Sequence, residues 1–223
     1  MKSAIVLLSG GLDSTTLLYY VKNKGLTPHC LIFEYGQRHR REINQAKQIA
    51  RRVGCDYRVV KIALPWQGSA LLDQKIKLPE RQVIDPTEIP ATYVPARNII
   101  FLSFAVSYAE AIGAQSVFIG ANAIDYSGYP DCRPEFFAAY QQTLKKGLKS
   151  GVEGKTIKIQ VPFVRKTKAQ IIQLGLKLKV PYHLTWSCYS SGKSPCGKCD
   201  SCFLRSKGFE ELGLREASLT RYK

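Results

Sequence analysis

The chain has 223 residues, of which 45% are hydrophobic and 10% aromatic. That is enough apolar material for one large core, and it excludes low-complexity disorder, collagen and a membrane-spanning chain. The longest uncharged apolar stretch, Ile99 to Tyr108, is about half as long as a bilayer requires. The apolar stretch near the N-terminus is too short for a signal peptide. We therefore expect a cytoplasmic protein.

Positive charge is concentrated in the last third of the chain. The 33 basic and 17 acidic residues give a net charge of +16. Residues 1–144 hold 16 basic and 12 acidic residues, whereas residues 145–223 hold 17 basic and 5 acidic residues. Such a surplus attracts nucleic acid, nucleotides or phosphate-bearing substrates, but it is equally typical of a solvated lysine-rich surface. Both interpretations stay open at this point.

Apolar β-rich stretches alternate with amphipathic helical stretches along most of the chain. Strands are predicted at Ala4–Leu8, His29–Phe33, Tyr57–Ile62, Ser116–Gly120 and Lys158–Val161. Helices are predicted at Ser14–Lys24, Arg40–Val53, Asn98–Ile112, Pro134–Leu148 and Lys168–Leu178. This alternation predicts an α/β fold with a doubly wound parallel sheet.

Two segments fall outside this alternation. Residues 63–96 hold five of the eleven prolines and form a long irregular connection, which we expect to act as a flexible lid or an interface arm. Residues after about 180 lose their periodicity and are rich in cysteine, glycine, serine and lysine. We therefore predict a main domain over residues 1–180 and a C-terminal appendage over residues 181–223.

A glycine-rich loop, Ser9-Gly10-Gly11-Leu12-Asp13-Ser14, lies between the first predicted strand and the first predicted helix. Glycines there let main-chain N–H groups approach a phosphate, and the helix N-terminus adds a partial positive charge. The alternative is an ordinary turn in which Asp13 or Ser14 caps the helix. The loop lacks both the Gly-Lys-Ser/Thr of a Walker A sequence and the G-x-G-x-x-G of dinucleotide-binding proteins.

This loop resembles the pyrophosphate-binding loop of the ATP pyrophosphatase (PP-loop) family. The resemblance implies an adenine nucleotide α-hydrolase-like, Rossmann-like fold that binds ATP together with Mg²⁺. The implied ATP-binding residues are Leu8, Ser9, Gly10, Gly11, Leu12, Asp13, Ser14, Thr15, Thr16, Leu17 and Leu18. Asp13 and Ser14, with Arg97 from a later segment, are the implied catalytic residues.

Four cysteines lie close together near the C-terminus, namely Cys188, Cys196, Cys199 and Cys202. Four soft ligands at this spacing are typical of a tetrahedral Zn²⁺ site, and a filled four-cysteine shell leaves no open position for catalysis. We therefore predict one structural Zn²⁺ per chain, with a redox pair and an iron–sulfur cluster as alternatives. Cys132 lies apart from the cluster in a polar loop, where a nucleophilic thiol is a further alternative.

Three polar segments are placed at the carboxyl edge of the predicted sheet, where ligands bind in open α/β folds. They span residues 35–42, 93–98 and 121–133. Arginines there suit a carboxylate or phosphate, and acidic residues suit the N–H edge of a base. Arg38 and Glu42 are also spaced as an ordinary i,i+4 helix pair. The candidate substrate-binding residues are Gln37, Arg38, Asn98, Asp125, Tyr126, Asp131 and Arg133.

The order of these features resembles that in the 7-cyano-7-deazaguanine synthase family. The glycine-rich loop comes first, followed by residues 35–39, 94–98 and 125–133 and then by the four cysteines, so that the resemblance covers nearly the whole chain. It implies an ATP-dependent carbon–nitrogen ligase, a homodimer in the family. The substrates would be 7-carboxy-7-deazaguanine and ammonia, and the product the nitrile base on the route to queuosine and archaeosine.

Within that scheme Arg97 or Arg38 holds the substrate carboxylate, and Asp125 or Asp131 accepts hydrogen bonds from the base. A tRNA-modifying thiolase or lysidine-type ligase built on the same loop is the alternative, in which basic residues contact phosphates. A zinc-ribbon nucleic-acid-binding module would explain only the cysteines and the basic tail. We favour the free base as substrate, with no obligatory nucleic acid and no membrane, because the candidate base-binding residues lie outside the basic third.

Overall fold

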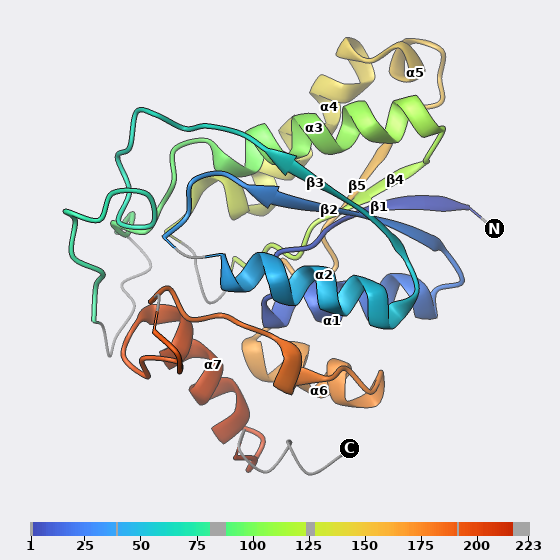
Figure 1. Cartoon of the computed structure of the whole chain (residues 1–223). Coiled ribbons are helices and arrows are strands. Elements are labelled where there is room, and N and C mark those ends of the chain that lie inside the picture. The colour runs from blue at the N-terminus through green and yellow to red at the C-terminus, as the bar shows by residue number, and fades with distance from the viewer. Residues whose placement is uncertain (1, 39, 81–87, 124–127, 191, 216–223) are drawn as a thin grey trace.

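A five-stranded parallel sheet forms the centre of the molecule (Figure 1). The computed structural model describes residues 2–38, 40–80, 88–123, 128–190 and 192–215. The strands are β1 (Ser3–Leu7), β2 (Thr27–Glu34), β3 (Asp56–Lys61), β4 (Ser116–Phe118) and β5 (Lys158–Gln160). Their order in the sheet is β3-β2-β1-β4-β5. The chain adds β2 and β3 on one side of β1 and then β4 and β5 on the other side. The carboxyl ends of β1 and β4 therefore form a topological switch point.

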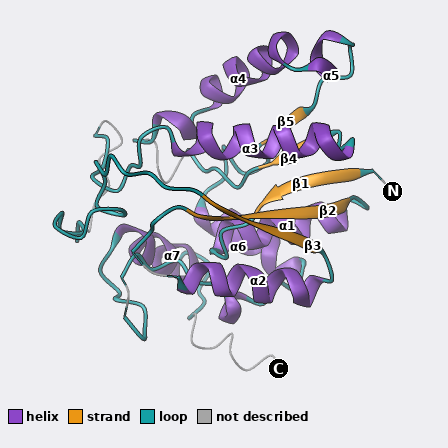
Figure 2. Cartoon of the chain, turned by 45° about the horizontal axis from the view of Figure 1, so that its top comes forward, coloured by secondary structure: helices purple, strands orange, loops and turns teal. Residues whose placement is uncertain are grey.

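Helices cover both faces of the sheet, as Figure 2 shows from a second direction. One face carries α1 (Leu12–Asn23) and α2 (Arg41–Val53). On the same side, α6 (Lys168–Lys177) packs against α1, and α7 (Asp200–Glu210) packs against α6. The other face carries α3 (Arg97–Ile112) and α4 (Pro134–Gly147), and the short α5 (Lys149–Val152) follows α4. Two 3-10 helices, η1 (Pro130–Cys132) and η2 (Tyr182–Leu184), complete the described elements. The predicted doubly wound α/β fold is confirmed.

Strand β1 is buried on both faces and joins the two halves of the core. Ala4 and Val6 pack on the side of α1, α2 and α6, whereas Ile5 and Leu7 pack on the side of α3 and α4. Successive side chains of a strand point to opposite faces, so a strand covered on both sides needs an uninterrupted apolar sequence. The first predicted strand has such a sequence, and its central position explains why.

Each predicted strand and helix has an observed counterpart, and the bounds agree to within about two residues at each end. Strand β4, for example, ends at Phe118 rather than Gly120. Residues 63–80 and 88–96 contain no helix or strand, as predicted for the irregular connection. An isolated bridge between Glu80 and Cys199 joins this connection to the C-terminal segment. None of the helices within the described ranges is both long and apolar enough to cross a membrane.

Helix α7 was not predicted, because the sequence after residue 180 has no helical periodicity. The packing of α7 on α6 explains why its sequence is not typical of a helix. A Cβ atom on Gly208 would lie 2.6 Å from Lys168 Cγ and 2.9 Å from Ile172 Cδ1. Glycine is less favourable than alanine in a helix by about 1 kcal/mol. Gly208 therefore allows α7 to approach α6 closely, but it also weakens the helical signal of the sequence. Phe209 then packs edge-on against Tyr182, with ring centroids 5.7 Å apart.

Candidate active site

A pocket of about 270 Å³ opens at the carboxyl ends of β1, β2 and β4. This is the topological switch point, where ligands bind in open α/β sheets. The pocket is lined by the glycine-rich loop, the first turns of α2 and α3, the start of α6 and the C-terminal segment. Its polar lining includes Ser9, Asp13, Ser14, Tyr35, Glu42, Arg97, Asn98, Lys168 and Arg205. Segments that are far apart in the sequence therefore meet in one pocket.

The glycine-rich loop is held by hydrogen bonds within itself. Ser14 Oγ accepts from the main-chain N–H of Ser9 at 3.2 Å and donates to the carbonyl oxygen of Gly11 at 3.3 Å. Gly10 has a φ of +82°, and a Cβ there would lie 2.7 Å from a main-chain nitrogen of α2. Helix α1 begins at Leu12, so its N-terminal N–H groups lie at the loop. These are the features of an anion-binding site.

Asp13 is paired with a lysine that the sequence interpretation missed. Lys168 Nζ lies 2.9 Å and 2.6 Å from the two carboxylate oxygens of Asp13. The lysine is buried at the start of α6, where Thr167 and Gln170 form a capping box. That capping box is the one sequence signal that marks the position as the start of a helix. It does not reveal a partner 155 residues away.

The implied ATP-binding residues divide into two groups. Those that line the pocket are Leu8, Ser9, Gly11, Leu12, Asp13 and Ser14. Those that do not line it are Gly10, which packs against the main chain of α2, and Thr15, Thr16, Leu17 and Leu18, which are buried beneath the loop. Thr16 Oγ1 donates to the carbonyl oxygen of Leu12 at 2.9 Å and lies 2.9 Å from the hydroxyl of Tyr182. The second group therefore supports the loop from the core.

Away from the glycine-rich loop, Arg97 and Glu42 share a part of the pocket lining with Tyr35 and Tyr189. Arg97 Nη1 donates to the hydroxyl of Tyr35 at 3.1 Å. Glu42 Oε1 accepts from Gln37 Nε2 at 3.1 Å. Burial raises the pKa of Glu42 to about 6, although the Gln37 hydrogen bond and the positive charge of Arg97 act to lower it. We name these residues the Glu42–Arg97 end of the pocket.

Arg38 is engaged with the irregular connection rather than with Glu42. Its Nη2 donates to the carbonyl oxygen of Asp73 at 2.8 Å and to that of Ile76. The interpretation of Arg38 and Glu42 as an i,i+4 helix pair is wrong, because α2 begins at Arg41. Arg38 lies before the helix and holds the connection in place.

Asn98 and Asp131 are bonded to each other. Asp131 Oδ2 accepts from the main-chain N–H of Asn98 at 3.0 Å, and Asn98 Nδ2 donates to the carbonyl oxygen of Asp131 at 3.0 Å. Asn98 lines the pocket, whereas the described lining does not include Asp131. The remaining predicted residues are Arg133, which is the N-cap residue of α4, and Asp125 and Tyr126, which lie outside the described residues.

Cys132 borders the pocket, but its thiol is not activated. Burial, together with the negative charge of Asp131, raises the pKa of Cys132 to about 12. Asn98 Nδ2 donates to the sulfur at 3.2 Å. A thiol with such a pKa is protonated at neutral pH, so it lacks the thiolate that a nucleophilic cysteine requires. The geometry therefore gives no support to a nucleophilic Cys132.

The four C-terminal cysteines come together as predicted and could hold a metal ion. The Sγ atoms of Cys188, Cys196, Cys199 and Cys202 all lie within 4.8 Å of one another. Four sulfurs that are each about 2.3 Å from a tetrahedral metal lie about 3.8 Å apart, so the spacing fits. The main-chain N–H groups of Ser190 and Cys196 both donate to Cys188 Sγ at 3.3 Å, which favours a thiolate.

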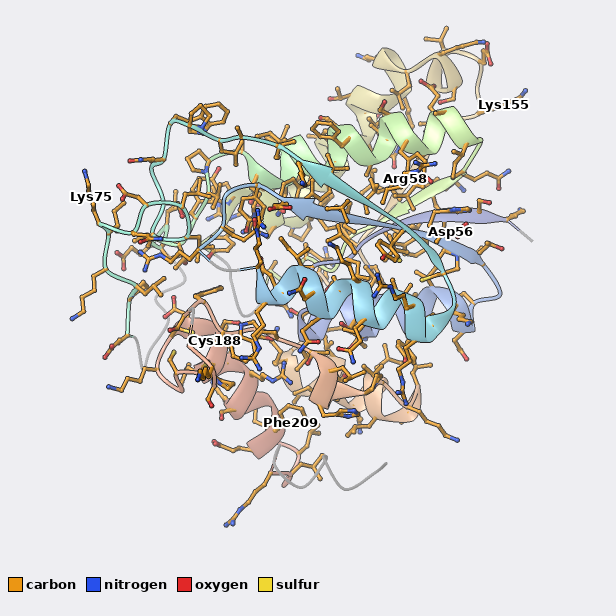
Figure 3. All side chains as sticks on the ribbon, viewed as in Figure 1. Asp56, Arg58, Lys75, Lys155, Cys188 and Phe209 are labelled. Carbon is orange, nitrogen blue, oxygen red and sulfur yellow. The ribbon has the colours of Figure 1, made fainter. Side chains whose placement is uncertain are left out.

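The cysteine cluster is tied to the glycine-rich loop through Trp186. The main-chain N–H of Trp186 donates to the carbonyl oxygen of Gly10 at 2.9 Å, and its indole N–H donates to that of Cys188 at 2.9 Å. The guanidinium of Arg41 lies 3.9 Å from the centroid of the indole ring. Figure 3 shows Cys188 near the start of α7, with Phe209 farther along the same helix. The C-terminal segment therefore holds the loop in place.

Comparison with known sequences identifies the family. The model of the family described as queuosine biosynthesis protein QueC matches residues 3–213. This chain belongs to the QueC family. The 7-cyano-7-deazaguanine synthase of Thermoplasma acidophilum is 54% identical over 213 residues, which are 95% of this chain and 89% of that protein. The 7-cyano-7-deazaguanine synthase of Trichormus variabilis is 52% identical over 217 residues, which are 96% of each chain.

A solved structure supports the fold assignment of this chain. The U34-tRNA thiolase NcsA from Methanococcus maripaludis, with its [4Fe-4S] cluster, superposes with a TM-score of 0.51 and 17% sequence identity. The similarity covers 100% of this chain and 74% of that chain. At this low identity the likeness concerns the fold alone. The family match confirms the resemblance that was drawn from the loop, the polar segments and the cysteines.

Proposed function

We propose that this QueC-family chain converts 7-carboxy-7-deazaguanine and ammonia into 7-cyano-7-deazaguanine with ATP. The observation that carries the proposal is the sequence identity of 54% and 52% to two proteins named 7-cyano-7-deazaguanine synthase, over most of their length. The pocket supports it, because one end is suited to phosphates and the other combines aromatic, cationic and acidic side chains.

ATP would bind with its phosphates at the glycine-rich loop. The N–H groups at the start of α1 and the hydroxyl of Ser14 are suited to phosphate oxygens, and Lys168 adds a positive charge. Mg²⁺ supplied with ATP would neutralise phosphate charge, and Asp13 is the carboxylate at the loop. Because Asp13 also holds Lys168, we expect the two side chains to act as a unit.

The conversion of a carboxylate into a nitrile removes two oxygen atoms and therefore needs two activations. A carboxylate oxygen attacks the α-phosphorus of ATP and pyrophosphate leaves; ammonia then displaces AMP and loses a proton, which gives the amide. The amide oxygen is adenylated in the same way, with pyrophosphate leaving, and loss of AMP and of both amide protons gives the nitrile. The loop favours AMP and pyrophosphate as products, with ADP and phosphate as the alternative.

Arg97 is the proposed partner of the substrate carboxylate. It lines the pocket, and its guanidinium donates to the neutral hydroxyl of Tyr35 rather than to an acidic side chain. Arg38 is less suited, because two carbonyl oxygens already accept from its guanidinium. The planar guanidinium of an arginine matches a carboxylate in a bidentate arrangement.

The cysteine cluster would hold one Zn²⁺ per chain in a structural role. Four thiolates fill a tetrahedral shell and leave no position for a substrate. The link from Cys188 through Trp186 to Gly10 supports a role in holding the glycine-rich loop. The homodimer, the cytoplasmic location, the absence of an obligatory nucleic acid and the division near residue 180 stay predictions.

Mass spectrometry of a reaction mixture tests the proposal. Nuclease-treated protein incubated with 7-carboxy-7-deazaguanine, ammonium and Mg-ATP should form the amide first and then the nitrile. Asp13→Ala and Ser14→Ala should each form neither product, while their folds stay intact. A protein that is inactive on the free base, but regains activity when tRNA is restored, would contradict the proposal and favour a tRNA-modifying enzyme.

A further inference from the structure

Two carboxylates line the pocket in the part of the chain that the structure describes, and their surroundings differ. Asp13 is neutralised by Lys168, whose Nζ lies 2.6 Å from Oδ2. Among the residues that the structure describes, the Glu42 carboxylate accepts one hydrogen bond, from Gln37 Nε2 to Oε1 at 3.1 Å. Its second oxygen, Oε2, has no hydrogen-bond partner among the described residues. Glu42 therefore has acceptor capacity left for a ligand.

Gln37 fixes the orientation of that carboxylate. The Gln37 amide oxygen accepts from the main-chain N–H of Tyr35 at 2.8 Å, and its nitrogen donates to the carbonyl oxygen of Phe33 at 3.1 Å. The end of β2 thus holds both ends of the amide, and the same nitrogen also donates to Glu42. Gln37 is a positioning residue in this arrangement, and Glu42 is oriented before a ligand binds.

A carboxylate is an unfavourable neighbour for anionic ligands. ATP and 7-carboxy-7-deazaguanine both carry negative charge. The cationic side chains of Lys168 and Arg97 attract such ligands, whereas an ionised Glu42 repels them. Burial raises the pKa of Glu42 to about 6, against the opposite effects of Gln37 and Arg97, so the side chain is still ionised at neutral pH. An ionised, partly unsatisfied carboxylate fits a pocket whose ligand brings N–H donors.

The walls near Glu42 suit a flat ring. Tyr35, Phe33 and Phe101 line the same pocket. The rings of Phe33 and Phe101 stack with centroids 4.0 Å apart and an angle of 6° between their planes. Aromatic walls bind planar heterocycles, whose edges are then read by hydrogen bonds. In a deazaguanine the donor edge consists of the ring N1–H and the exocyclic 2-amino group.

We propose that Glu42 determines specificity for the guanine-type base by accepting hydrogen bonds from N1–H and the 2-amino group. This inference rests on the proposed function, because the base is the substrate of that reaction. Glu42 takes the role that the sequence interpretation gave to Asp125 or Asp131. Asp131 is not among the described residues that line the pocket, and Asp125 lies outside the described residues.

The test compares two substrates that differ in one donor: 7-carboxy-7-deazaguanine and its analogue without the 2-amino group. The wild-type enzyme should prefer the first by roughly 10–100-fold in kcat/KM, which is the contribution of one hydrogen bond to a charged group. Glu42→Gln preserves the size of the side chain. It should reduce the preference to about threefold or less, through a higher KM for the guanine-type base, because the charge-assisted bond is lost.

Glu34→Gln is the matched control. Glu34 lies at the end of β2, pairs with Arg40 at 2.6 Å and is not among the described residues that line the pocket, so the preference should be unchanged. Thermal unfolding and the KM for ATP are measured for both variants, and Glu42→Gln should remain folded with an unchanged KM for ATP.

Each other outcome has a definite meaning. A folded Glu42→Gln enzyme with the wild-type preference would overturn the inference and leave the proposed function intact. A raised KM for ATP with an unchanged preference between the two bases would indicate that Glu42 contacts the nucleotide, and it would also overturn the inference. A wild-type enzyme that converts neither base would remove the proposed function itself, and the inference with it.

Discussion

The two ends of the pocket balance their charges in different ways. At the loop end, Asp13 and Lys168 form an ion pair at 2.6 Å, and the start of α1 supplies N–H donors. At the Glu42–Arg97 end, the described residues contain no ion pair between the two side chains, and burial raises the pKa of Glu42. The loop end therefore holds its counter-ion in the free protein, whereas we expect the Glu42–Arg97 end to be completed by a ligand. Mutations at the first should act on catalysis, and mutations at the second on recognition and stability.

The largest effect is expected when the loop end loses its support from the cysteine cluster. Cys199→Ser removes a buried ligand, and zinc contributes about 10–16 kcal/mol of apparent folding free energy in small metal-binding modules. Metal analysis should find about one Zn²⁺ per wild-type chain and little in the variant. Turnover should be lost, because the contact between Trp186 and Gly10 depends on this segment.

Cys55→Ser is the matched control, since Cys55 lies outside the cluster and its loss should leave the metal content unchanged. A brown wild-type protein that carries iron would contradict the assignment of zinc. A metal-free protein with full activity would show that the cluster does not support the loop.

The next effect concerns the ion pair itself. Lys168→Met removes a positive charge from the loop end and leaves Asp13 without its counter-ion. Turnover should fall roughly 10²–10³-fold, as it does when one group that stabilises charge in a transition state is removed. Lys177→Met, on the exposed side of the same helix, should have no such effect. Steady-state kinetics of both variants checks this, and near-normal turnover of Lys168→Met would exclude the lysine from the mechanism.

The Glu42–Arg97 end should respond in stability. Because burial raises the pKa of Glu42 from 4.5 to about 6, the folded state binds the proton more tightly than the unfolded state. The stability that this proton contributes is present below pH 4.5 and is lost as the pH rises through 6. Glu42→Gln should therefore unfold with a free energy up to about 2 kcal/mol higher than the wild type at pH 7.

Denaturant unfolding between pH 5 and pH 7 measures this difference, which should grow with pH. Equal pH profiles for the wild type and Glu42→Gln would mean that the carboxylate carries no burial penalty. In that case the two ends of the pocket would not differ as described.

The smallest effect is expected at the surface contact beside the loop. The guanidinium of Arg41 lies 3.9 Å from the centroid of the Trp186 ring, and Arg41 is exposed. A cation–π contact at an exposed site contributes about 0.5–1 kcal/mol. Arg41→Ala should therefore lower the melting temperature by about 1–4 °C in a chain of this length. Calorimetry checks the shift, and a changed preference between the two bases would contradict the separation of the two ends.

The geometry of the loop end was largely predictable, because its residues are adjacent in the sequence between a strand and a helix. The six consecutive residues Ser9–Ser14 are therefore enough to indicate the loop from the sequence alone. Lys168 was not predictable, since only the fold brings it to Asp13 from 155 residues away. Glu42 was misread for a related reason: its spacing to Arg38 suggested a helix pair, and the helix begins too late to include Arg38.

The fold itself was predictable where burial is periodic. The apolar sequence of β1 and the amphipathic sequence of α2 each report the faces that they bury. Helix α7 gave no such signal, because Gly208 was required by contact with α6 rather than by the helix. The residue type at position 208 is therefore explained by tertiary packing rather than by helix propensity.

The hydrogen bond from Trp186 to Gly10 also sets the order in which a newly made chain can complete its loop. Ribosomes add about 5–20 residues per second, starting from the N-terminus. A nascent chain therefore carries Ser9–Ser14 throughout most of its synthesis, without the lysine at 168 and the main-chain donor at 186. A chain that ends before residue 168 has the residues of the glycine-rich loop but lacks both the contact from Lys168 to Asp13 and the contact from Trp186 to Gly10.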